Sequence, residues 1–120
     1  MISRYFEHIE NVILNFNNIS SHSIEKKYYS HTKGFIKGII IFTNGYKLEF
    51  MEVKDTEISS KDKYKYHFMD EQNNLIFRYD NAPLHREIKT FPHHKHLSTE
   101  TIESVEPDLL DILLEIRKII

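Results

Sequence analysis

The segment Phe35–Phe50, FIKGIIIFTNGYKLEF, decides the fold of this chain. Its first part, Phe35–Thr43, is nearly continuously apolar and rich in β-branched residues, which is typical of a central strand buried on both faces. Asn44-Gly45 follows, and this dipeptide favours a hairpin turn in which both residues adopt positive φ. Apolar and polar residues then alternate through Tyr46–Met51, as in a half-exposed strand. The segment therefore predicts an antiparallel hairpin.

Strand-like patterns flank this hairpin on both sides. A strand around Ile24–His31 precedes it, and Tyr64–Met69 alternates between aromatic residues and residues of other types. The polar turn Asp70–Asn74 leads to a further strand at Leu75–Asp80. Because consecutive strands joined by short turns pair with one another, we expect an antiparallel meander of about five strands.

An amphipathic helix is predicted at each end of the chain. Within residues 1–18, apolar side chains recur at spacings of three and four, which places them on one helix face. Near the other end, Pro107 stands at a helix start, and an apolar stripe runs from Leu109 to Ile120. The expected fold class is α+β, one domain over residues 1–120 in which both helices cover one face of the sheet.

Composition excludes several kinds of chemistry. The 120 residues contain no cysteine, so disulfides, cysteine-based zinc sites and a thiol nucleophile are excluded. A net charge of −2 argues against a chain that binds nucleic acid over its whole surface. The charged N-terminus does not look like a secretion signal, and the longest apolar run is too short to span a bilayer. We expect a cytoplasmic protein that does not interact with membranes.

One third of the chain is locally basic. Residues 61–96 hold seven basic and five acidic side chains, together with five of the eight histidines. Most of these histidines lie in residues 81–101, which show no regular period, and irregular segments of this length are usually functional. Because histidine titrates near neutral pH, this segment becomes more positive as the pH falls.

The residue types in this segment suit metal-independent cleavage of RNA. That reaction needs a base for the 2′-hydroxyl, an acid for the leaving 5′-oxygen and a cation against charge on phosphorus. We assign the cations to Arg78 and Lys95, the acid–base pair to His85 with His94 or His96, and an orienting role to Asp80. Four further residues are expected to contact the substrate, with the two tyrosines stacking on bases: Tyr66, His67, Tyr79 and His93. No metal or cofactor is expected.

Two other interpretations use the same residues. His94 and His96 would face one way on a strand, so that together with Asp80 they could bind a divalent metal in a metal-dependent nuclease or hydrolase. Alternatively, the basic segment could hold RNA without cleaving it, as a binding module. The simplest interpretation is a solvated histidine-rich loop in which Arg78 and Asp80 form a surface salt bridge of little energetic value.

Two motifs resemble those of a known family. Phe77–Pro83, FRYDNAP, and Phe91–His96, FPHHKH, are similar to motifs of the TumE toxins of toxin–antitoxin systems. One departure is Leu84, where the family often carries another histidine. The resemblance implies the toxin of a type II module, a proposed ribonuclease activity, and an antitoxin that binds DNA and is encoded by the neighbouring gene. The arrangement of terminal helix and antiparallel sheet is also similar to that of RelE-like toxins, at the level of fold alone.

Overall fold

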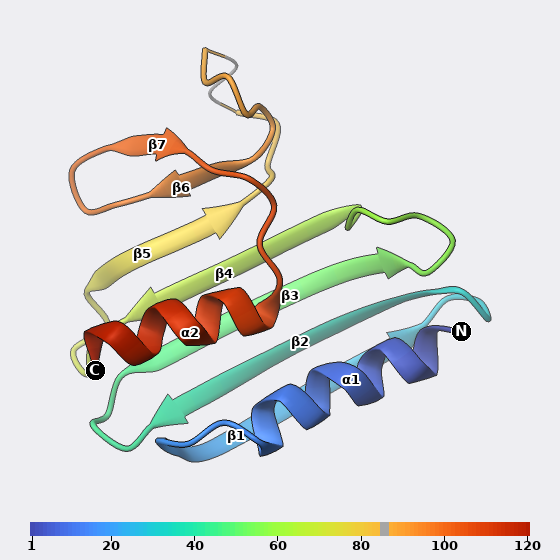
Figure 1. Cartoon of the computed structure of the whole chain (residues 1–120), viewed down its shortest axis with the longest axis horizontal. Helices are drawn as coiled ribbons and strands as arrows, with labels where there is room; N and C mark the ends of the chain where they lie inside the picture. The colour runs from blue at the N-terminus through green and yellow to red at the C-terminus, as the bar shows by residue number, and fades with distance from the viewer. Residues whose placement is uncertain (85–86) are drawn as a thin grey trace.

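Figure 1 shows a computed structural model of the chain, which describes residues 1–84 and 87–120. A seven-stranded sheet has its strands in chain order, and every neighbouring pair is antiparallel. The elements are α1 (Ile2–Leu14), β1 (Ile19–Tyr28), β2 (Lys33–Phe42), β3 (Lys47–Asp55), β4 (Lys63–Met69), β5 (Leu75–Asp80), β6 (His94–His96), β7 (Thr101–Glu103) and α2 (Leu109–Ile119). The α+β class and the meander are confirmed. The strand number was predicted too low, because β6 and β7 are too short to show a sequence period.

The β2–β3 hairpin forms as predicted but with a different turn. Gly45 adopts a φ of +90°, whereas Asn44 does not enter the positive-φ region. The Gly45 amide donates to the Phe42 carbonyl at 2.9 Å, and the Phe42 amide donates to the Tyr46 carbonyl at 2.8 Å. The turn is therefore a three-residue loop with glycine in the left-handed position, a common alternative to the two-residue turn.

Both helices lie on one face of the sheet, α1 over β1 and β2 and α2 over the following strands (Figure 1). The prediction that β2 is buried on both faces is wrong, because every second residue of β2 is buried while Ile39 on the other face is 41% exposed. No helix within residues 1–84 and 87–120 covers that other face, which we call the open face.

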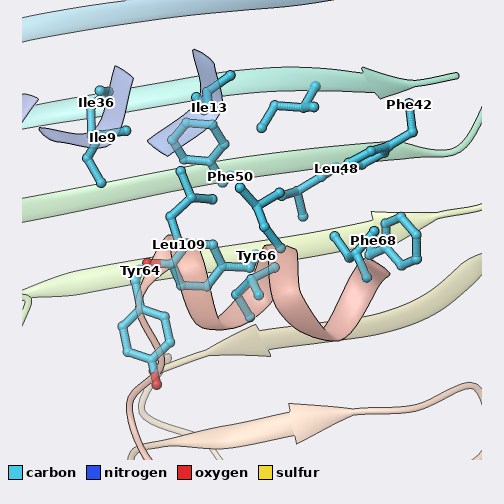
Figure 2. Packing of buried hydrophobic residues seen from close by; sticks show 14 of the residues in the cluster. Ile9, Ile13, Ile36, Phe42, Leu48, Phe50, Tyr64, Tyr66, Phe68 and Leu109 are labelled. Carbon is cyan, nitrogen blue, oxygen red and sulfur yellow. The ribbon is translucent and has the colours of Figure 1, made fainter. Parts of the chain in front are cut away.

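The helix-covered face holds the hydrophobic core (Figure 2). Aromatic rings pack along it, and the ring centroids of Phe68 and Phe77 are 5.2 Å apart. Helix α1 approaches β2 so closely that a Cβ on Gly34 would lie 2.9 Å from the Phe6 ring, which explains a glycine in this strand. Figure 2 shows Leu109 of α2 over Tyr64 and Tyr66 of β4.

The helix ends follow local rules. Asp108 and Asp111 form a reciprocal capping box at the start of α2, with each carboxylate accepting the other's backbone amide at 2.8 and 3.0 Å. Helix α1 ends at Leu14 rather than at residue 18, and β1 begins earlier than predicted. Asn18 takes a φ of 76°, which reverses the chain into β1.

A buried carboxylate lies within the core. Glu52 of β3 is 0% exposed and accepts hydrogen bonds from the hydroxyls of Tyr66, at 2.5 Å, and of Tyr5. Burial, followed by the charge of Glu52, raises the pKa of both tyrosines, so both remain donors. The carboxylate thus ties β3 to β4 and to α1.

Across the described ranges, neither helix combines the length and the apolar character that crossing a bilayer requires.

Candidate active site

Strand β6 brings the histidine-rich motif back to the strand that carries Arg78 and Asp80. In the β5–β6 pairing, Arg78 faces His96 and Asp80 faces His94. Since these residues alternate with Phe77 and Tyr79 of the helix-covered face, all four side chains project from the open face. A segment expected to be an irregular loop is therefore partly a strand that extends the sheet (Figure 1).

The Asp80 carboxylate is the centre of this group, and we call Arg78, Asp80, His94 and His96 the Asp80 cluster. Oδ1 lies 2.8 Å from Nε2 of His94 and accepts the Ala82 amide at 3.0 Å. Oδ2 accepts from Nε of Arg78 at 2.9 Å and lies 3.2 Å from Nε2 of His96. Four nitrogen atoms thus surround a carboxylate with about four acceptor positions, so the site holds it in one orientation.

The far side of each imidazole is also held. Nδ1 of His94 lies 2.8 Å from the Pro92 carbonyl, which can only accept, so this nitrogen carries a hydrogen. Nδ1 of His96 lies 3.2 Å from Oγ1 of Thr101 on β7. The two rings are perpendicular with centroids 4.6 Å apart. Both rings therefore present Nε2 to Asp80.

Burial divides the cluster into an inner and an outer half. Asp80 and His94 are 3% and 1% exposed, whereas the side chains of His96 and Arg78 are 25% and 39% exposed. A substrate on the open face would therefore meet Arg78 and His96, supported from below by Asp80 and His94. This support is what keeps a functional side chain in one rotamer.

A third histidine lies on the other side of Arg78. His67 of β4 is the cross-strand partner of Arg78, which in turn is the partner of His96, so the His67–Arg78–His96 row crosses β4, β5 and β6. Burial, followed by the positive charge of Arg78, lowers the pKa of His67, although Glu49 on β3 acts in the opposite direction. His67 is therefore neutral at pH 7.

Three of these side chains also form a possible metal site. One donor atom each from Asp80, His94 and His96 lies within 4.8 Å of the other two. Imidazole nitrogens with a carboxylate oxygen suit zinc and related transition ions, and outward hydrogen bonds from the rings are typical of metal-bound histidines. The guanidinium of Arg78, bound to the same carboxylate, opposes a second cation there.

Lys95 and Tyr79 lie on the helix-covered face, away from the cluster. Nζ of Lys95 is 2.7 Å from the Glu115 carboxylate of α2 and 4.9 Å from the centre of the Tyr79 ring. Tyr79 donates its hydroxyl to the same carboxylate. Burial lowers the pKa of Lys95, but the contacts with Glu115 and Tyr79 outweigh it and raise this pKa overall. The assignment of Lys95 as a phosphate cation beside His94 and His96 is thus not supported, because adjacent residues of a strand face opposite sides.

Two other expected contact residues also point away from the open face. Tyr66 is 0% exposed and bound to Glu52, so no base can stack on it, which corrects that prediction (Figure 2). His93 stacks on Tyr64 with ring centroids 5.8 Å apart, and its Nδ1 lies 2.8 Å from the Tyr64 hydroxyl. His85 lies outside the described residues.

Sequence reasoning missed the residues that frame the site. The side-chain oxygen of Asn81 accepts the Tyr64 amide at 3.0 Å and so continues the β4 ladder past the end of β5. Lys65 is the cross-strand partner of Asp80, and Thr101 contacts His96. The alternation of Lys65 with the buried Tyr64 and Tyr66 was the available signal for its position on the open face.

The open face can therefore offer a neutral imidazole, a guanidinium and a carboxylate-supported imidazole on three neighbouring strands. This combination can move protons at two points and stabilise an anion between them.

No curated protein and no solved structure matches the chain. The family model described as Toxin TumE matches residues 9–120, which include both motifs and every residue of the Asp80 cluster. The chain therefore belongs to the TumE toxin family.

Proposed function

We propose that this toxin acts by cleaving RNA without a metal, using the His67–Arg78–His96 row. The observation that carries the proposal is the placement of Arg78 between two histidines, one neutral and one supported by a carboxylate. A phosphate bound at Arg78 would have an imidazole on either side. That arrangement suits in-line displacement at phosphorus.

Each group has one role in the proposed reaction. Neutral His67 takes the proton of the 2′-hydroxyl, whose oxygen attacks phosphorus and forms the P–O2′ bond. The P–O5′ bond breaks, and His96 as imidazolium gives its proton to the leaving oxygen. Arg78 stabilises the charge on the phosphoryl oxygens. Asp80 and His94 position the row, and the products are a 2′,3′-cyclic phosphate and a 5′-hydroxyl.

Membership of a toxin family supports an antitoxin partner. We propose that the antitoxin is a DNA-binding protein encoded by the neighbouring gene and that the toxin acts on RNA in the cytoplasm. The role of His85 as acid or base stays a prediction.

A metal-dependent nuclease is the second candidate. It is favoured by the three donor atoms of Asp80, His94 and His96 within 4.8 Å of one another. In that case the ion would activate a water and bind the phosphate. The two candidates differ in their response to a chelator.

Replacing Arg78 tests the proposal directly. Cleavage of RNA by purified toxin should persist in excess EDTA and fall about a hundredfold or more in R78A, since one preorganised donor to a developing oxyanion contributes this much. R78K should recover part of the rate, because it keeps the charge but loses the two-pronged contact. The measurement is the single-turnover rate of cleavage of a labelled RNA.

K118A is the matched control, because it removes a cation from the exposed end of α2. Loss of cleavage in EDTA with recovery on adding zinc or manganese would establish the second candidate instead. An R78A variant as fast as wild type would refute the role of the row, and intact RNA under all conditions would refute cleavage altogether.

The pH profile of cleavage should reveal His67. Its pKa lies below the ordinary 6.5 because burial and Arg78, with Lys65 and His96, outweigh Glu49. Protonation removes the base, so the rate should fall as the pH drops, with a midpoint below 6.5. The measurement is the single-turnover rate from pH 4.5 to 8.

In H67Q the fall in rate at low pH should disappear. Its cleavage rate at neutral pH should be about a hundredfold lower than that of wild type, the usual contribution of a general base. H8Q, on the exposed side of α1, should behave like wild type. A midpoint above 6.5, or an unchanged fall in rate at low pH in H67Q, would show that His67 is not the base.

A further inference from the structure

A hollow of about 520 Å³ lies on the open face, next to the His67–Arg78–His96 row. Its apolar lining includes Phe35, Ile39 and Met51, and its charged side chains are Lys37, Lys65, Glu25 and Glu49. Pockets of this size accept small molecules and single groups of larger ligands. Nothing in the proposed reaction uses this hollow.

The hollow and the candidate active site form one continuous surface. Lys37, Met51, Lys65 and Asp80 are successive cross-strand partners over β2, β3, β4 and β5. Lys65 therefore both lines the hollow and borders the Asp80 cluster. Because neighbouring strands are about 4.8 Å apart, the hollow begins within two strands of the cluster.

The chemistry of the lining suits a nucleotide. Phe35 offers an aromatic ring with Nζ of Lys27 5.9 Å from its centre, so a stacked base and a nearby phosphate would both find a partner. Lys37 is paired with Glu25 at 3.5 Å, but both side chains are more than half exposed, so this pair is weak and Lys37 can turn to a phosphate. Met51 adds an adaptable apolar surface.

We propose that this hollow binds a nucleotide of the RNA on one side of the bond that is cleaved. The proposal rests on the proposed function, since it takes the substrate to be RNA. RNA is favoured over a protein as the occupant because Lys65 makes the hollow continuous with the proposed cleavage site. RNA-binding sites combine cations with aromatic platforms, and here Phe35 lies beside Lys27 and shares the hollow with Lys37 and Lys65.

The test uses binding, so that it does not depend on cleavage. The probe is a fluorescent single-stranded RNA octamer in which every 2′-hydroxyl is methylated, so that no bond can be cut by attack of a 2′-oxygen. The double variant F35A/K37A should bind it about tenfold more weakly than wild type, the loss expected for one stacked base. Cleavage of an all-ribose dinucleotide, which is too short to span both sites, should be unchanged.

The matched control is L110A/K118A, which removes one exposed apolar side chain and one exposed lysine from α2. K37E, a substitution at an exposed position, provides a second variant if F35A/K37A fails to fold. Equal octamer binding by wild type and variants would overturn the proposal. Loss of antitoxin binding with unchanged RNA binding would also overturn it and assign the hollow to a protein. Absence of cleavage with variant-sensitive octamer binding would refute the catalytic proposal and keep the nucleotide site.

Discussion

Replacing Asp80 with asparagine is expected to lower RNA cleavage about a hundredfold, the usual contribution of correctly oriented acid–base groups. The two carboxylate oxygens of Asp80 lie 2.8 to 3.2 Å from four nitrogen atoms, of which the Ala82 amide and Nε of Arg78 donate to them. Asparagine keeps one accepting oxygen and turns an amide group toward two of those donors. His96 and Arg78 would lose their common support while keeping their own chemistry.

The same variant should lose about 3 kcal/mol of unfolding free energy, because it leaves buried donors beside a group that cannot accept from them. Urea denaturation followed by circular dichroism measures this loss. D62N is the control, since Asp62 forms an exposed ion pair with Lys33 at 3.0 Å and should change stability by less than about 1 kcal/mol. Wild-type cleavage by D80N would show that Asp80 does not position the row.

Replacing Glu52 with alanine should have the largest effect on stability. We expect the free energy of unfolding to fall by about 3 to 4 kcal/mol, because two tyrosine hydroxyls lose their acceptor and a cavity forms. Glu52 is 0% exposed and accepts from Tyr5 and Tyr66. Both hydroxyls would lose their acceptor within the core. The measurement is again the unfolding free energy in urea.

E52Q should lose less than E52A, because glutamine fills the space and still accepts one hydroxyl. Below its unfolding temperature, E52A should cleave RNA like wild type, since Glu52 and the row lie on opposite faces of the sheet. A loss below about 1 kcal/mol in E52A would mean that the tyrosines find other acceptors. Loss of cleavage by an E52A variant that is still folded would show that the core face influences the activity on the open face.

The regular elements were predictable because they carry strong periods. Apolar spacing of three and four located both helices, alternation located β3 and β4, and the polar turn before it located β5. The short strands β6 and β7 were not predictable, since three residues carry no measurable period and their pairing depends on β5 being in place. The same alternation could have excluded Lys95, which lies between His94 and His96 and so must face the helices.

The candidate site was predicted in its residue types more than in its geometry. Arg78, Asp80, His94 and His96 come together, and His67 joins them from the neighbouring strand. Tyr66 and His67 are adjacent in β4, so their side chains point to opposite faces of the sheet. Both could therefore not contact a substrate on the open face. Glu52 accepts the Tyr66 hydroxyl within the core. The local sequence around Glu52 does not indicate that this carboxylate is buried.

The strand order has a consequence for the cell that makes this toxin. Each strand pairs with the strands before and after it in the chain, so the sheet can grow in step with translation. His67 and Arg78 leave the ribosome first, whereas His94 and His96 arrive with the last hairpin. A nascent chain that stalls before residue 94 lacks the histidine pair, strands β6 and β7, and the α2 side chains that complete the core. Under the proposed function, the cleavage surface is therefore complete only at the end of synthesis.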